Sequence, residues 1–91
     1  MTEKALAELI NLGPRSAKML MDAGISSFAE LEECGAVEAY LAIKREGIPV
    51  SLNMLYAIHG ALNGVPWNTI DRGEREELIR ELDDRMEEDG M

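Results

Sequence analysis

The 91-residue chain is long enough for one domain with a modest hydrophobic core, and its single cysteine, Cys34, excludes an intrachain disulfide and a metal site built from cysteines. Its 18 acidic and 9 basic residues give a net charge of −9, which argues against strong, non-specific binding of nucleic acid. No apolar run approaches the roughly 20 residues that span a membrane, and the first residues lack the pattern of a signal peptide, so we expect a cytoplasmic protein.

Apolar residues recur at helical spacing along the chain, and no segment alternates apolar and polar residues as a strand would. This pattern predicts a single all-α domain over residues 1–91, with five to six helices. We expect the first helix over residues 3–10, capped by Thr2, and the second from Pro14 to about Ala23.

The turn between these two helices, from Asn11 to Gly13, is the most informative stretch of the chain. Gly13 can adopt backbone angles that are closed to other residues, and Pro14 fits the first position of the next helix. The small side chain of Ala17 would let the two helices cross closely. These features are typical of a helix-hairpin-helix.

Two short helices are expected after the hairpin. A capping box formed by Ser27 and Glu30 predicts a helix over residues 28–34. Gly35 is expected to end that helix and to separate it from a fourth helix over residues 36–46.

Two longer helices complete the predicted domain. Ser51 is expected to cap a fifth helix over residues 52–63, which is apolar over much of its circumference and should be the most buried. Trp67 lies in the turn that follows, and we expect its indole to pack on the core. A second capping box, which starts at Asp71, predicts a sixth helix over residues 72–88.

The hairpin is the candidate site for nucleic acid or another anion. The N–H groups at the start of its second helix carry the positive end of the helix dipole, and a phosphate can approach them beside Gly13. Ser16 can donate a hydroxyl, and Arg15 and Lys18 can flank the phosphate. The other interpretation is a packing corner with solvated polar residues, because Asn11 stands where nucleic-acid-binding hairpins have a glycine.

A narrow apolar stripe on the last predicted helix also has two interpretations. It consists of Leu78, Leu82 and Met86, and charged residues cover most of the remaining surface of that helix. The stripe either packs back on the core or forms an oligomer interface on a helix that extends from the core. Residues 71–91 contain four basic and ten acidic residues, so they contribute 4 − 10 = −6 of the net charge of −9.

The sequence shows no set of catalytic, cofactor-binding or metal-binding residues. His59 is the only histidine, and no partner at catalytic or ligand spacing accompanies it. Cys34 follows two glutamates, which would raise the pKa of its thiol rather than activate it. Adjacent acidic residues such as Asp83 and Asp84 point about 100° apart on a helix, so they do not converge on a metal ion. We therefore expect no enzyme, no cofactor and no small-molecule substrate.

Five stretches of the chain form a recognisable set: Leu12–Ala17, Gly24-Ile25 followed by Phe28–Leu31, Gly35–Leu41, Ser51–Leu62, and Trp67 followed by a charged final helix. Together they resemble the C-terminal domain of the TfoX/Sxy family of competence (DNA transformation) regulators, over roughly residues 5–82. The positions that match the family's hairpin are Leu12, Gly13, Pro14, Ser16 and Ala17.

The resemblance implies an all-α fold with a helix-hairpin-helix or SAM-like arrangement, and it implies no catalytic residues. Full-length members of the family regulate natural DNA uptake as transcriptional co-activators, and they carry a separate N-terminal domain for which 91 residues leave no room. We therefore expect a stand-alone domain. At His59 the chain departs from the family, which usually has a glutamate-like residue before the glycine that corresponds to Gly60.

These observations predict a non-enzymatic regulatory or adaptor module that acts through protein–protein interaction, with a protein partner or with a second copy of itself. The resemblance links this module to transcriptional regulation of competence. The alternative is a weak DNA-binding domain in which Gly13, Arg15, Ser16 and Lys18 contact phosphate.

Overall fold

The computed structural model describes residues 6–88, and the helices of this part of the chain are joined by short turns, without a strand. The α-helices are α1 (Pro14–Asp22), α2 (Phe28–Arg45), α3 (Leu52–Asn63) and α4 (Arg72–Glu88), and the short 3₁₀ helices are η1 (Leu6–Glu8) and η2 (Trp67–Thr69). The all-α prediction is confirmed. The predicted number of helices is wrong, because the described residues form four α-helices rather than five to six.

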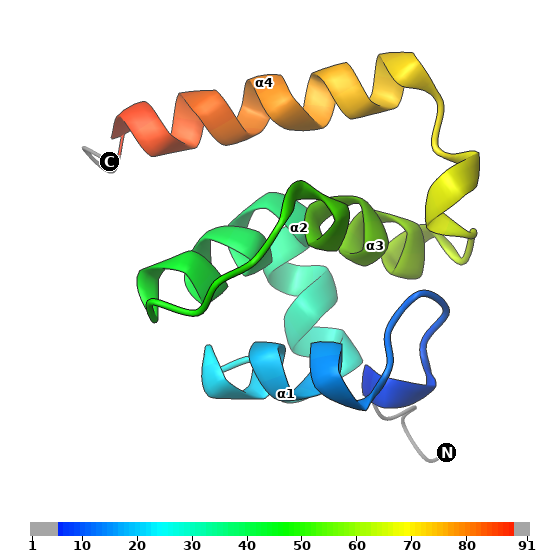
Figure 1. Ribbon diagram of the computed structural model, residues 1–91, viewed down its shortest axis with the longest axis vertical. Helices are drawn as coiled ribbons and strands as arrows, with labels where there is room; N and C mark the ends of the chain where they lie inside the picture. Colours follow the sequence, from blue (N-terminus) through cyan, green and yellow to red (C-terminus); the bar gives the residue numbers. More distant parts are fainter. Residues whose placement is uncertain (1–5, 89–91) are drawn as a thin grey trace.

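The helices form three layers, with the α2–α3 pair in the middle and α1 and α4 on its opposite sides (Figure 1). The core lies between these layers and is almost entirely aliphatic, as expected from the scarcity of aromatic residues. Its largest fully buried side chains are Leu20, Leu31, Val37, Leu41, Ile43, Leu55 and Ile58. None of the helices in the described part of the chain is long and apolar enough to cross a membrane.

Gly35 explains why two predicted helices form a single element. Its backbone has φ 82° and ψ 167°, so α2 is broken at this residue although it continues on both sides. The half before Gly35 rises from α1 towards the middle layer, and the half after it packs beside α3 (Figure 1). The sequence therefore located the break correctly, but the helix resumes directly after Gly35, and the two halves form one kinked element.

The first predicted helix differs most from the structure. Where an α-helix was expected over residues 3–10, residues 6–8 form one 3₁₀ turn, and Thr2 with residues 3–5 lies outside the described residues. An α-helix on the N-terminal side of the predicted hairpin is therefore not seen between Leu6 and Pro14. The helix-hairpin-helix or SAM-like arrangement stays a prediction.

The helix caps agree with the sequence at two positions and disagree at a third. The Ser27 hydroxyl accepts a hydrogen bond from the Glu30 N–H at 3.2 Å, and the Asp71 carboxylate accepts one from the Glu74 N–H at 2.8 Å. Ser51 precedes α3, but its side chain makes no capping bond, so that prediction is wrong. The bounds of α3 are confirmed, and six of its twelve residues are buried.

Helix α4 packs back on the core of its own chain. Leu78 and Leu82 are only 8% and 6% exposed, and the half-buried Met86 packs against the same core. The Glu38 carboxylate in α2 accepts a hydrogen bond from the Arg85 guanidinium at 2.8 Å. An oligomer interface at Leu78, Leu82 and Met86 stays a prediction, and it would require α4 to separate from the core of its own chain.

Candidate functional site

The turn before α1 depends on Asn11 rather than on Gly13. Asn11 has a φ of 72°, in the left-handed region, which asparagine adopts more readily than most residues. Gly13 has φ −118° and ψ −171°, an extended conformation open to any residue, and a Cβ placed on it would meet nothing within 4 Å. The prediction that this turn uses the special backbone freedom of Gly13 is therefore wrong.

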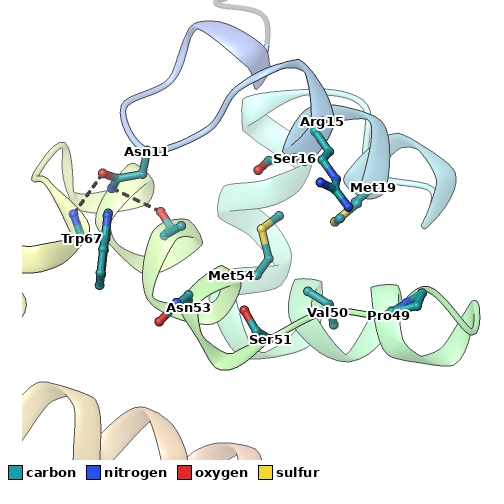
Figure 2. A pocket seen from close by; sticks show the side chains of 11 residues that line it. Asn11, Arg15, Ser16, Met19, Pro49, Val50, Ser51, Asn53, Met54 and Trp67 are labelled. Carbon is teal, nitrogen blue, oxygen red and sulfur yellow. Dashed lines mark hydrogen bonds between the residues drawn. The ribbon is translucent and has the colours of Figure 1, made fainter.

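The Asn11 side chain ties this turn to the far end of α3. Its amide nitrogen donates to the Val65 carbonyl at 2.9 Å. The same nitrogen donates to the Ala57 carbonyl at 3.4 Å, and the amide oxygen accepts from the Trp67 N–H at 2.9 Å (Figure 2). Gly60 makes this approach possible, because a Cβ there would lie 2.5 Å from the Asn11 amide nitrogen and 2.6 Å from the Val65 carbonyl oxygen. The turn at Asn11 and the end of α3 are therefore packed so closely that no side chain fits between them at Gly60.

This connection forms one end of a groove of about 420 Å³ between α1 and the start of α3. The thioether of Met54 lies in the middle of the groove, with Met19 on the α1 side and the indole of Trp67 near Asn11 (Figure 2). Arg15 extends its guanidinium along the same groove (Figure 2). The site thus combines a large apolar surface with one positive charge.

Two helix N-termini meet at the groove, and neither has a side-chain cap. Gly13 precedes α1, and Ser51 precedes α3 without capping it. Arg15 and Ser16 in the first turn of α1, and Asn53 in the first turn of α3, line the groove. The N–H groups of a helix's first turn carry a partial positive charge, so both termini add to the positive potential of the groove.

The four residues predicted to contact an anion are only partly brought together. Arg15 and Ser16 line the groove, and Gly13 lies just before them. Lys18 does not line it, and its ammonium group pairs with the Asp22 carboxylate at 3.1 Å on the exposed surface of α1. A pair of free cations around one phosphate, as the sequence suggested, is therefore absent from this part of α1.

Sequence reasoning missed the apolar part of the groove. Trp67 is 40% exposed, so the prediction that its indole packs on the core is wrong. Its backbone N–H is fixed by Asn11, which holds the residue at the surface instead of in the core. A tryptophan directly after Pro66, in a turn, was the one signal in the sequence that pointed here.

His59 and Cys34 lie away from this groove. The His59 Nε2 lies 3.2 Å from a carboxylate oxygen of Glu74, so the side chain links α3 to α4. Burial raises the pKa of the Cys34 thiol, and the neighbouring Glu38 and Glu33 raise it further. The sequence predicted the direction from the two preceding glutamates, of which Glu33 contributes. Within residues 6–88, no three His, Cys, Asp or Glu side chains lie close enough to hold a metal ion together.

Comparison with known proteins agrees with the resemblance noted in the sequence. The model of the TfoX C-terminal domain matches residues 2–82. The chain belongs to this family. The DNA transformation protein TfoX of Haemophilus influenzae is 27% identical over 86 residues, which cover 94% of this chain and 40% of that protein. The chain thus spans about two fifths of the length of this curated relative.

Two crystal structures of uncharacterised Listeria monocytogenes proteins have a similar fold. In the triclinic form the sequence identity is 36% and the TM-score 0.78, with 82% of this chain and 85% of that chain covered. In the tetragonal form the identity is again 36% and the TM-score 0.77, with 82% and 93% covered. The arrangement of helices seen here is therefore found in experimentally determined relatives.

Proposed function

We propose that this family member is a non-enzymatic regulatory module of the cytoplasm that binds a protein partner through the groove between α1 and α3. The observation that carries the proposal is the exposed indole of Trp67, which shares one groove with Met19, Met54 and Arg15. Trp, Met and Arg are the residue types enriched at the centres of protein–protein interfaces. The relative named a DNA transformation protein supports a role in the regulation of competence.

The proposal is tested by capturing proteins from extracts of the organism that encodes the chain, with three baits. The wild type is compared with Met19→Gln, in the groove, and with Met21→Gln, a matched change on the same helix at a residue that is 58% exposed and outside the groove. We expect one partner to be retained by the wild type and Met21→Gln and lost with Met19→Gln. Circular dichroism confirms that each bait is folded.

A partner that all three baits retain equally would contradict binding through this groove. Deleting the gene gives an independent readout of the regulatory role, because we expect the frequency of natural transformation to fall. Restoring the gene with Met21→Gln should recover that frequency, whereas Met19→Gln should not.

Weak DNA binding at the start of α1 is the second candidate. Its support is the pair of uncapped helix N-termini together with Arg15. A labelled 20-base-pair duplex should then bind at low salt. With one or two phosphate contacts, a plot of the logarithm of the binding constant against the logarithm of the salt concentration should have a slope of about −1 to −2. Binding that persists in the double variant Arg15→Glu, Lys18→Glu would exclude this site.

A further inference from the structure

The charge of the α1–α3 groove differs from that of other hollows on the same molecule. Arg15 is the charged residue that lines it, and no aspartate or glutamate among residues 6–88 does. A hollow of about 500 Å³ between α3 and α4 is lined by Glu74, Glu77 and Glu81. Another, of about 370 Å³ beside α2, is lined by three glutamates as well: Glu30, Glu33 and Glu38.

Arg15 is available for an intermolecular contact. Its side chain is exposed, and it has no ion pair with another residue of the described chain. Its neighbour Lys18, by contrast, is already paired with Asp22. In a chain with twice as many acidic as basic residues, an unpaired arginine beside two uncapped helix N-termini makes this groove favourable for a negative group.

The groove also requires an apolar group from its occupant. Met54 is 8% exposed, and its thioether forms an apolar floor between Met19 and Trp67 (Figure 2). Methionine and tryptophan present large, adaptable contact surfaces that favour an aliphatic or aromatic side chain. An isolated anion would leave this part of the groove unfilled.

From these two requirements we infer that the groove binds a segment of another protein in which an aspartate or glutamate lies next to a bulky apolar side chain. The apolar side chain packs on Met54 between Met19 and Trp67, and the carboxylate pairs with the guanidinium of Arg15. This inference rests on the proposed function and specifies the chemistry of the partner. It would explain how an acidic protein recognises an acidic segment without repulsion at the contact.

The leucine stripe on α4 of a second copy fits the groove less well. Helix α4 offers many carboxylates, but its large apolar residues Leu78 and Leu82 are buried on their own core. A copy that kept its fold would therefore present the negative charges of α4 without these two leucines as an apolar anchor. A separate protein segment can present both groups together.

The inference is tested by selecting 12-residue peptides from a random phage-displayed library on the wild-type protein. We expect the enriched sequences to contain Asp or Glu within two residues of Leu, Ile or Phe. Trp67 is the only tryptophan of the chain, so the emission of the protein reports binding of tryptophan-free synthetic peptides. Replacing the peptide's acidic residue by its amide should weaken binding about tenfold.

Charge reversal provides the matched control. Arg15→Glu should abolish binding of the acidic peptide and should favour a version of the same peptide with lysine in place of the acidic residue. Lys18→Glu, which changes the same charge one turn away and outside the groove, should alter the affinity less than twofold. Thermal melts establish that the exposed substitutions leave the fold intact.

The outcomes separate this inference from the proposed function. The inference is overturned if the selected peptides change Trp67 emission but lack an acidic residue, or if Arg15→Glu leaves their affinity unchanged. Either result leaves protein binding at the groove in place. If no peptide is enriched, or if enriched peptides bind without changing Trp67 emission, both proposals fail. Duplex DNA that competes with the peptides and loses binding with Arg15→Glu would favour the DNA-binding alternative and overturn the inference.

Discussion

Helix α3 meets the N-terminal turn and helix α4 through contacts of different kinds. Towards the turn, the Asn11 amide makes three hydrogen bonds to backbone groups, and Gly60 brings the two segments to the closest approach that the backbone allows. Towards α4, the links are the pair of His59 and Glu74, in which the Glu74 side chain is 53% exposed, and the Arg75 guanidinium, which lies 5.2 Å from the centroid of the Tyr56 ring. We infer that the first contact is rigid and shapes the groove, whereas the second can relax.

The largest expected effect is that of Gly60→Ala. The new Cβ would meet the Asn11 amide and the Val65 carbonyl at about 2.5 Å, and one of these partners is backbone, so the turn must move. We expect a loss of about 3 kcal/mol in the free energy of unfolding, measured by urea denaturation. Gly13→Ala is the control, because it adds the same methyl group in open space and should change stability by less than about 1 kcal/mol.

A change on the α4 side should cost somewhat less. Leu82→Ala removes a side chain that is 6% exposed, and we expect a loss of roughly 2 kcal/mol, at the lower end for buried leucines, because α4 can relax towards the gap. Leu52→Ala, at a residue that is 41% exposed, should cost well under half as much. If Leu82→Ala lowered the free energy of unfolding more than Gly60→Ala did, the α4 contact and not the contact at Asn11 would be the more rigid of the two.

Asn11 allows hydrogen bonding and backbone strain to be separated. Asn11→Ala loses the three hydrogen bonds and keeps an unfavourable left-handed φ, so we expect a loss of about 2 kcal/mol. Asn11→Gly loses the same bonds without the strain and should be about 1 kcal/mol more stable than the alanine variant. Equal stabilities for the two variants would show that the left-handed conformation contributes nothing.

The smallest expected effect is that of His59→Gln. The pair with Glu74 is partly solvated, so we expect a change below about 0.5 kcal/mol at neutral pH, measured by thermal denaturation. Added salt should reduce even this difference. A loss above 1 kcal/mol would show that the α4 contact depends on His59 as strongly as the N-terminal contact depends on Asn11.

The elements that the sequence predicted correctly are those with local signals. Gly64 has the left-handed conformation that ends α3, and Asp71 caps the start of α4, so the bounds of both helices could be predicted from neighbouring residues. The break at Gly35 was also visible, although the sequence did not show that the helix resumes at once. These local signals were therefore enough to place the bounds of α3 and α4.

The groove could be predicted only in part. Arg15 and Ser16 were predicted because they follow the Gly-Pro pair that marks the start of a helix. The role of Asn11 depends on partners that are distant in the sequence. Nothing near Trp67 indicates that its backbone is held at the surface by this asparagine. A surface made of residues from α1, α3 and η2 exists only once the helices have packed, and helical periodicity carries no information about it.

The bonds of Asn11 also bear on how the domain folds. They close chain segments of 46, 54 and 56 residues, to Ala57, Val65 and Trp67 respectively. The entropy lost in closing such long loops is recovered only after the intervening helices have formed, so we expect this wall of the groove to form late. The groove then belongs to the complete native state, and a partner present at 100 times its dissociation constant would add about 2.7 kcal/mol to the stability of the whole domain. The abundance of the folded protein would thereby follow the supply of its partner.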